Sequence, residues 1–217
     1  YTDCGLMTCH PLIGEDATAV FNMLSGYSEP PTWNRLILAP LWLRNRCVRM
    51  IRRETMRARE GKPAHIMAKM NSLCDQEIIA CLYEASCAGV KIELVVRGIC
   101  CLKAGVPGLS DNISVHSIVG NFLEHARIFY FENGGSPEVY MGSADWMPRN
   151  IDHRIEAYAP VYDPEIRREL KTIVEFGLAD NVAARIVDGT GRNLIYDNGE
   201  PPFRSQQKLY EHYHDLS

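Results

Sequence analysis

The sequence FLEHARIFYFE, residues 122–132, predicts a strand that carries two chemically useful side chains. Residues two apart on a strand point to the same face of a sheet, so His125 and Arg127 project together. A second apolar run follows and ends in GSAD at residues 142–145, which adds a hydroxyl and a carboxylate. This set suits a phosphoryl group, because the guanidinium neutralises charge, the imidazole transfers a proton or attacks phosphorus, and the carboxylate orients the imidazole.

A structural role for the same residues is the alternative. A single histidine in an amphipathic strand is usually a packing residue whose hydrogen bonds are satisfied. The polar residues near Ser143 form an internal ion-pair network as readily as they form a phosphate site. This polar group comprises Asp145, Arg149, Asn150, Asp152 and Arg154.

The composition is that of an ordinary globular protein, with 217 residues, 46% of them hydrophobic and 23% charged. The net charge of −4 argues against a general nucleic-acid binder. The eight cysteines include no Cys-x2-Cys pair, which predicts reduced thiols in an intracellular protein. No run reaches transmembrane length and no secretory signal is visible, but in a fragment these absences say little about the parent protein. We expect a cytoplasmic location, with membrane association left open. The chain begins at Tyr1 without a methionine, and we expect it to be a fragment of a longer protein.

Apolar periodicity and helix breakers predict alternating strands and helices, which is an α/β fold class. The tail from Gly189 is polar and is expected to be peripheral or mobile. Strands are predicted at 1–9, 36–39, 66–70, 91–96, 114–119, 126–131, 138–142 and 155–162, and helices at 16–24, 42–60, between a cap at Ser72 and a stop at Gly89, and from Pro164 to about residue 179, with a break at Pro30-Pro31.

Arg97 lies directly after the strand predicted at 91–96, and open α/β sheets bind ligands at that end of their strands. A cation that ends an apolar run needs solvent or a partner. A structural carboxylate such as Glu93 or Asp111 is the alternative to a bound anion.

Longer motifs resemble two related families. The spacing His-x-Arg-x4-Glu, then Gly-Ser-x-Asp, resembles the motif of the phospholipase D superfamily, with Arg127 in place of Lys, Glu132 in place of Asp and Asp145 in place of Asn. The whole chain is similar to the carboxy-terminal part of bacterial polyphosphate kinase of the first type. The motifs that carry this similarity are Asn71-Ser-Leu, Tyr83-Glu-Ala-Ser, Gly89-Val-Lys-Ile, Val96-Arg-Gly-Ile-Cys100, Pro107-Gly-Leu-Ser110, Ser117-Ile-Val119, Leu123-Glu-His125, Phe131-Glu-Asn-Gly-Gly135 and Ser143-Ala-Asp-Trp-Met147-x-Arg-Asn150.

The resemblance implies an α/β sandwich of the phospholipase D type, with a mixed β-sheet and helices on both faces. It implies that Tyr1, in Tyr-Thr-Asp, contacts the nucleotide, that Arg97, in Val-Arg-Gly, binds phosphate, and that His125 is catalytic and also contacts ATP or phosphate. Arg127, Ser143 and Asp145 are expected to support the site. The domains implied are the end of a preceding phospholipase D-like domain at 1–30, a second such domain at 31–188, and a peripheral tail at 189–217.

The implied activity is reversible transfer of the terminal phosphoryl group of ATP to inorganic polyphosphate. The family's phosphorylated histidine and the arginines associated with Mg²⁺ belong to the first domain, upstream of Tyr1, so no metal site is expected in this chain and the chain alone is expected to be inactive. ATP, ADP and polyphosphate are the implied partners, without nucleic acid, and the full-length protein is expected to be a homo-oligomer. A phosphodiesterase or nuclease of the same superfamily, or a non-catalytic polyphosphate-binding module, are the alternatives.

The helix predicted at 42–60 has an uneven charge. Glu54 is its only acid before Glu60, against seven arginines. A solvated face is the ordinary explanation, and docking of a polyanion or of a partner is the alternative, because arginine suits bidentate phosphate binding. The arginines are Arg44, Arg46, Arg49, Arg52, Arg53, Arg57 and Arg59.

Overall fold

The computed structural model describes residues 2–26 and 32–215. Within these ranges the strands form one eight-stranded sheet with the order β1-β7-β6-β5-β2-β3-β4-β8. Strands β2, β3 and β4 are parallel to one another, and the remaining pairs are antiparallel. The strands are β1 (Ile37–Ala39), β2 (His65–Met70), β3 (Lys91–Val96), β4 (Ile113–Ile118), β5 (Arg127–Phe131), β6 (Glu138–Gly142), β7 (Glu156–Val161) and β8 (Ala184–Ile186).

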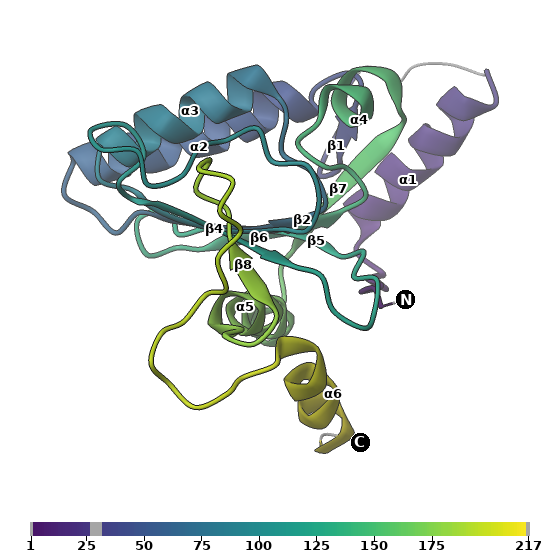
Figure 1. Cartoon of the computed structure of the whole chain (residues 1–217). Coiled ribbons are helices and arrows are strands. Elements are labelled where there is room, and N and C mark those ends of the chain that lie inside the picture. Colours follow the sequence, from purple (N-terminus) through teal and green to yellow (C-terminus); the bar gives the residue numbers. More distant parts are fainter. Residues whose placement is uncertain (1, 27–31, 216–217) are drawn as a thin grey trace.

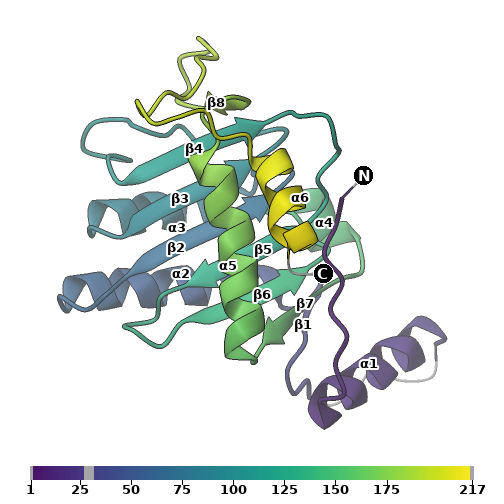
Figure 2. The ribbon, with the colours of Figure 1, turned by 90° about the horizontal axis from the view of Figure 1, so that it is seen from below.

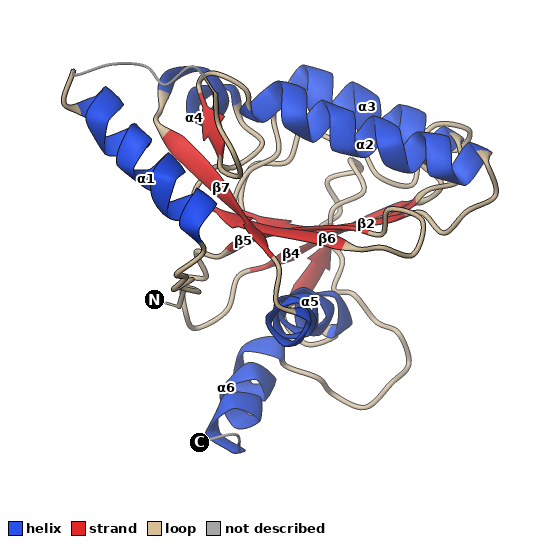
Figure 3. Ribbon diagram, turned by 180° about the vertical axis from the view of Figure 1, so that it is seen from behind, coloured by secondary structure: helices blue, strands red, loops and turns tan. Residues whose placement is uncertain are grey.

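Helices cover both faces of the sheet. Figure 1 shows α2 (Leu43–Arg59) and α3 (Gln76–Cys87) side by side on one face, with α5 (Pro164–Ala179) on the other. Figure 2 looks onto the α5 face, where α6 (Ser205–Asp215) lies beside α5. Figure 3 shows the resulting layers from behind. The expected mixed sheet with helices on both faces is therefore confirmed.

Two further helices lie near the β1–β7 edge of the sheet. They are α1 (Pro11–Leu24) and the short α4 (Pro148–His153), which precedes β7 in the chain. Within the described residues, no helix has the length and apolar character needed to cross a bilayer.

The core consists of two apolar layers, one on each face of the sheet. Along β5 every residue is buried, and successive side chains enter opposite layers as strand geometry requires. Phe129 and Phe131 join the cluster under α2 and α3, whereas Ile128 and Tyr130 join the cluster under α5. This central strand is therefore a fixed platform for the residues at its ends.

Most predicted elements are confirmed within a few residues, but three expectations were wrong and three elements were missed. Residues 2–9 form no strand apart from one bridge between Thr2 and Glu124. The first helix begins at Pro11, and α3 is capped by Asp75, whose carboxylate accepts a hydrogen bond from the Ile78 N–H at 3.0 Å. Helices α4 and α6 and strand β8 were not predicted.

The predicted break at Pro30-Pro31 and the residue Tyr1 lie outside the described residues. The division of the chain at residues 30/31 and 188/189 stays a prediction.

Candidate functional site

Strand directions bring distant parts of the chain together at one end of the central strands. The parallel strands β2 and β3 finish at this end, and β5, antiparallel to β2, begins here. Strand β6 ends beside the start of β5, where Arg127 pairs with Gly142. The segments that follow β2, β3 and β6 are joined by bridges of Leu73 to Cys100 and to Trp146. The candidate site lies on these joined segments.

Arg97 is held at the end of β3 by an amide and not by a carboxylate. Its Nε donates to Oδ1 of Asn71 at 3.0 Å, and its backbone N–H donates to the carbonyl of Met70 at 3.2 Å. The two carboxylates considered as structural partners are engaged elsewhere. Glu93 binds the His65 ring at 2.8 Å, and Asp111 accepts from the Gly108 N–H at 2.7 Å. The Arg97 charge is thus oriented but not neutralised by either of them.

Asp145 connects the end of β6 to its neighbours. Its Oδ1 accepts from the Asn71 backbone N–H at 2.8 Å and from Arg127 Nε at 3.1 Å. Both side chains of this ion pair are 8% exposed. A buried pair with a further hydrogen bond fixes geometry, since each charge needs the other in a region that excludes water. The expected contact of Asp145 with His125 is not made, because the carboxylate is directed at Arg127.

His125 lies two residues before β5, and not within the strand as predicted. It nevertheless meets Arg127, whose Nη1 lies 2.9 Å from each ring nitrogen and donates to the His125 carbonyl at 2.8 Å. The carboxylate at the imidazole is Asp3, whose Oδ2 lies 3.0 Å from Nδ1. An Nδ1–H donated to Asp3 fixes the orientation of the ring. Asp3 therefore has the orienting role that the sequence assigned to Asp145.

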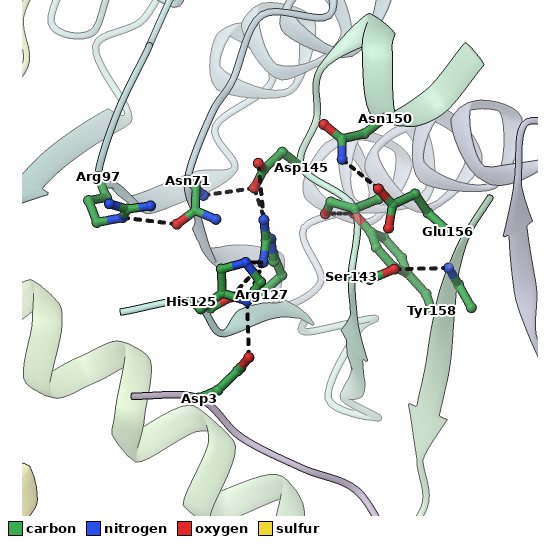
Figure 4. Close-up of polar contacts among 12 residues, drawn as sticks. Asp3, Asn71, Arg97, His125, Arg127, Ser143, Asp145, Asn150, Glu156 and Tyr158 are labelled. Carbon is green, nitrogen blue, oxygen red and sulfur yellow. Dashed lines mark hydrogen bonds and ion pairs between the residues drawn. The ribbon is translucent and has the colours of Figure 1, made fainter. Parts of the chain in front are cut away.

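Figure 4 shows these residues as one continuous line of polar contacts. The line runs from Arg97 through Asn71, Asp145 and Arg127 to His125 and Asp3. Its six members come from five separate segments of the chain. No sequence pattern indicated a role for Asp3 or Asn71, although Asn71 directly follows β2 just as Arg97 directly follows β3.

Ser143 and Glu132 make contacts outside this line. The Ser143 hydroxyl accepts from the Ala157 N–H at 3.3 Å, and its backbone N–H donates to the Ala157 carbonyl at 3.1 Å. Ser143 therefore joins β6 to β7. Glu132 lies past the other end of β5, where it accepts from the Tyr130 hydroxyl. The strand separates Glu132 from His125.

The ion-pair alternative accounts for part of the polar group after Asp145. Asp152 pairs with Arg44 at 2.6 Å, and this contact lowers the pKa of the Asp152 carboxyl. The Asn150 amide donates to Glu156 at 2.6 Å in a buried position (Figure 4). Arg149 and Arg154 are exposed. These contacts secure α4 beside the site.

A cavity of about 500 Å³ adjoins the Asp3 end of the line. Lys69, which is 5% exposed, forms a short ion pair with Glu124 in its wall, and Glu124 also accepts from the Gln206 amide at 2.9 Å. Tyr210 and Tyr213 of α6 line its apolar side. The cavity was not predicted, because α6, which lines it, was not, and the Lys69–Glu124 pair was not predicted either.

Among the described residues, no group of three or more His, Cys, Asp and Glu side chains is placed to hold a metal ion. The carboxylates nearest the site already have partners, Asp145 with Arg127 and Asp3 with His125. This donor set does not fit a resident Mg²⁺ ion.

Sequence comparisons identify the relatives of the chain. It matches the family model of the polyphosphate kinase C-terminal domain 2 over residues 36–206. It is 51% identical over 211 residues to a polyphosphate kinase of Parasynechococcus marenigrum, covering 96% of this chain and 30% of that protein. It is 48% identical over 209 residues to a polyphosphate kinase of Lactiplantibacillus plantarum, covering 92% of this chain and 29% of that protein. The chain thus spans less than a third of the length of these curated relatives.

Solved structures agree with the sequence comparisons. The polyphosphate kinase of Porphyromonas gingivalis superposes with a TM-score of 0.92 and 41% identity, over 97% of this chain and 32% of that chain. Nuc, a phospholipase D family member from Salmonella typhimurium, superposes with a TM-score of 0.51 and 14% identity, over 70% of this chain and 95% of that chain, which shows a shared fold. The family match covers most of the sequence. The chain therefore belongs to the polyphosphate kinase C-terminal domain 2 family.

Proposed function

We propose that this chain is the carboxy-terminal part of a polyphosphate kinase, which reversibly transfers the terminal phosphoryl group of ATP to inorganic polyphosphate. The transfer passes through a phosphohistidine in the portion of the enzyme upstream of Tyr1. The named relatives support the activity, since they are polyphosphate kinases that share about half of the residues of this chain. ATP, ADP and polyphosphate are accordingly the partners, and the longer protein is a homo-oligomer.

The observation that carries the proposal is the state of Arg97. Its guanidinium is oriented by the neutral Asn71 amide, and Glu93 and Asp111, the two carboxylates considered as its partners, bind other groups. A cation held in this way binds phosphate oxygens with little rearrangement, and its planar fork matches their geometry. In this proposal Arg97 binds the transferring phosphoryl group or its neighbour.

His125 acts on the transferring group from the side opposite the phosphorylated histidine. Asp3 and Arg127 fix the plane of its ring, so that it donates a hydrogen bond or a proton to the phosphoryl oxygens. Arg127 and Asp145 position His125 and the chain around it. Tyr1, two residues before Asp3 in the sequence, contacts the nucleotide. Positioning and charge neutralisation provide most of the rate in phosphoryl transfer.

Mg²⁺ accompanies the nucleotide in the proposed reaction and assists by neutralising phosphate charge. The donor set of the described residues does not fit this ion, and in this proposal the upstream portion of the enzyme holds it.

The test uses the longer protein that contains this chain. With ATP and short polyphosphate, it should lengthen the polymer and release ADP, and the Arg97→Gln variant should lose most of this activity while it remains folded. Hydrolysis of a phosphodiester without polymer formation would instead support the phospholipase D-type alternative. Polyphosphate binding without ADP release would support a non-catalytic module.

A further inference from the structure

Six of the seven arginines of α2 divide into two groups, and the seventh, the exposed Arg59 at the end of the helix, lies outside both. Three of them form ion pairs: Arg44 with Asp75 and Asp152, Arg53 with Glu138, and Arg57 with Glu60. Arg46, Arg49 and Arg52 are exposed and, among the described residues, have no carboxylate oxygen within 4.0 Å. They lie three residues apart, so successive guanidiniums follow the helix surface at a rise of about 4.5 Å. This group is a row of exposed cations that form no ion pair with the described residues.

The row lines a groove of about 600 Å³ between α2 and residues 33–37, the segment that leads into β1. Arg35 contributes a fourth cation from that segment, and it too makes no ion pair among the described residues. Trp33 and Trp42 form an aromatic wall, with ring centroids 6.0 Å apart in an edge-on arrangement. Trp42 is 43% exposed. We name the surface formed by six of these residues the α2 groove. They are Trp33, Arg35, Trp42, Arg46, Arg49 and Arg52.

A buried carboxylate holds the far side of the α2 groove in place. Asp16 of α1 is 2% exposed, and it accepts hydrogen bonds from the backbone N–H groups of Asn34, Arg35 and Leu36 at 2.9, 2.6 and 2.8 Å. Burial alone would raise the pKa of Asp16, but these hydrogen bonds lower it overall. Arg35 is therefore carried on an anchored segment, with its guanidinium carbon 5.8 Å from the centroid of the Tyr162 ring, and the anchoring reduces the entropy lost when an anion binds.

The α2 groove is longer than one hollow. A second hollow of about 330 Å³ shares Asn34, Arg35 and Arg46 with the first and continues past the ends of β6 and β7. The acids along both hollows are Glu77 and Glu138, and Glu138 is paired with Arg53 at 2.8 Å. The path is thus elongated and carries a net positive charge on a chain whose net charge is −4.

We propose that the α2 groove binds an extended inorganic polyphosphate chain at a distance from the site of transfer. The choice of ligand rests on the proposed function, and the evidence for the site is the groove itself. Four cations along an open path suit a flexible polymer of phosphates better than one compact phosphate, because each guanidinium can bind a different phosphate. Such binding retains the polymer between successive transfers.

The protein contains its own reporter for this binding. Of its three tryptophans, Trp33 and Trp42 line the α2 groove and Trp146 is fully buried. Titration of the 217-residue chain with polyphosphate of defined length should change the tryptophan fluorescence to a saturating value. Replacing Arg46, Arg49 and Arg52 together by Gln should weaken the affinity about tenfold, as expected for three exposed charge contacts.

A matched control removes the same charge elsewhere. Arg59→Gln, Arg168→Gln and Arg192→Gln together remove three exposed arginines outside the α2 groove, and this variant should bind within about twofold of the unmodified chain. Equal weakening in both variants, or equal affinity for single-stranded DNA of the same charge, would show that the protein attracts any polyanion by general electrostatics. Either result would overturn the proposal. An unchanged affinity in the groove variant would overturn it as well.

Assays of the longer protein separate this proposal from the proposed function. The groove variant should keep its turnover number with ATP and short polyphosphate but raise the KM for long polyphosphate several-fold. Equal KM values for long polymer in the variant and the unmodified enzyme would reject the α2 groove as a substrate contact. A longer protein that transfers no phosphoryl group at all would reject the proposed function, while polyphosphate binding in the fluorescence titration would still support the groove.

Discussion

At the scale of single residues, replacing Arg97 by lysine tests whether a positive charge alone is sufficient for phosphate binding at the end of β3. Arg97→Lys keeps the charge but loses the planar fork that binds Asn71 and, in the proposed function, phosphate. Phosphate contact in the longer enzyme should weaken by roughly 1–3 kcal/mol. Unchanged kinetic constants in a folded variant would reject the role, whereas a large loss of melting temperature would indicate a structural residue.

Substitutions of His125 test whether its imidazole transfers a proton to the phosphoryl group. His125→Ala in the longer enzyme should lower turnover by about two to four orders of magnitude, and His125→Gln should restore little, because glutamine donates a hydrogen bond but does not exchange a proton near neutral pH. Nucleotide affinity should change much less than turnover. If His125 only ties the chain to Asp3 and Arg127, Gln should keep near-normal turnover and Ala should mainly lower the melting temperature.

The residues of the site were predictable where they follow strands. Arg97, His125, Arg127 and Asp145 could be located because each lies next to a recognisable apolar run. Asp3 could not be placed beside His125, because the two are joined by a bridge between Thr2 and Glu124 that no local pattern indicates. The partner of a charged residue depends on tertiary geometry, so the sequence assigned Asp145 to the wrong group.

At the scale of elements, a hydrogen bond between β2 and β3 should make stability depend on pH. The pKa of the Glu93 carboxyl is lowered to about 2, mainly by the hydrogen bond with His65, against the cost of burial and with the help of Lys91. A depressed pKa stabilises the folded state above the ordinary value near 4.3, and this contribution is lost as the pH falls toward 2.

The measurement compares the original chain with Glu93→Gln by chemical denaturation at several pH values. The difference in unfolding free energy should be on the order of 2 kcal/mol at pH 6 and should shrink toward zero as the pH falls from about 4.5 to 2. A difference that does not vary across this window would contradict the role of the Glu93 charge.

Gly142 determines how closely β6 and β7 approach. A Cβ atom at this position would lie 2.5 Å from the Ala157 carbonyl and would overlap the ring of Tyr158, which is fully buried. Gly142→Ala should therefore cost about 1–3 kcal/mol and move Ser143 and Asp145 away from their partners. Thermal unfolding would measure the loss of stability, and the chemical shifts around Arg127 would measure the displacement of Asp145. The control is Gly135→Ala, which introduces backbone strain without a clash, because φ is positive there and a Cβ meets no atom within 4 Å.

Elements with strong periodicity were predictable, and those formed by tertiary contacts were not. Strand β3 was predicted with its observed limits, because four of the six residues before Arg97 are the apolar Ile92, Leu94, Val95 and Val96. Helix α6 has the sequence SQQKLYEHYHD, whose few apolar residues pack on α5 only in the folded chain. Strand β8 has three residues and is defined by its pairing with β4. Short or polar elements carry too little local signal.

At the scale of the whole molecule, the 217-residue chain should make no polyphosphate from ATP, because the phosphorylated histidine is expected upstream of Tyr1. Incubation with γ-labelled ATP, followed by acid lability and polymer analysis, tests this. Labelled polymer, or acid-labile label on His125, would show that the chain is catalytically complete. Addition of the upstream portion of the enzyme in trans provides the positive control.

The pairing of β1 with β7 has a consequence for how the chain folds. Ile37 of the edge strand β1 pairs with Tyr158 of β7, so β1 can join the sheet only after β7, more than a hundred residues later, has been synthesised. The hydrogen bond between Asp3 and His125 also joins residues that are far apart in the sequence. Non-local pairings require long loops to close before they stabilise the fold, and they slow folding. During synthesis, the parallel unit β2–α3–β3 can assemble first, and both the sheet edge and the site are completed only when the later strands have left the ribosome.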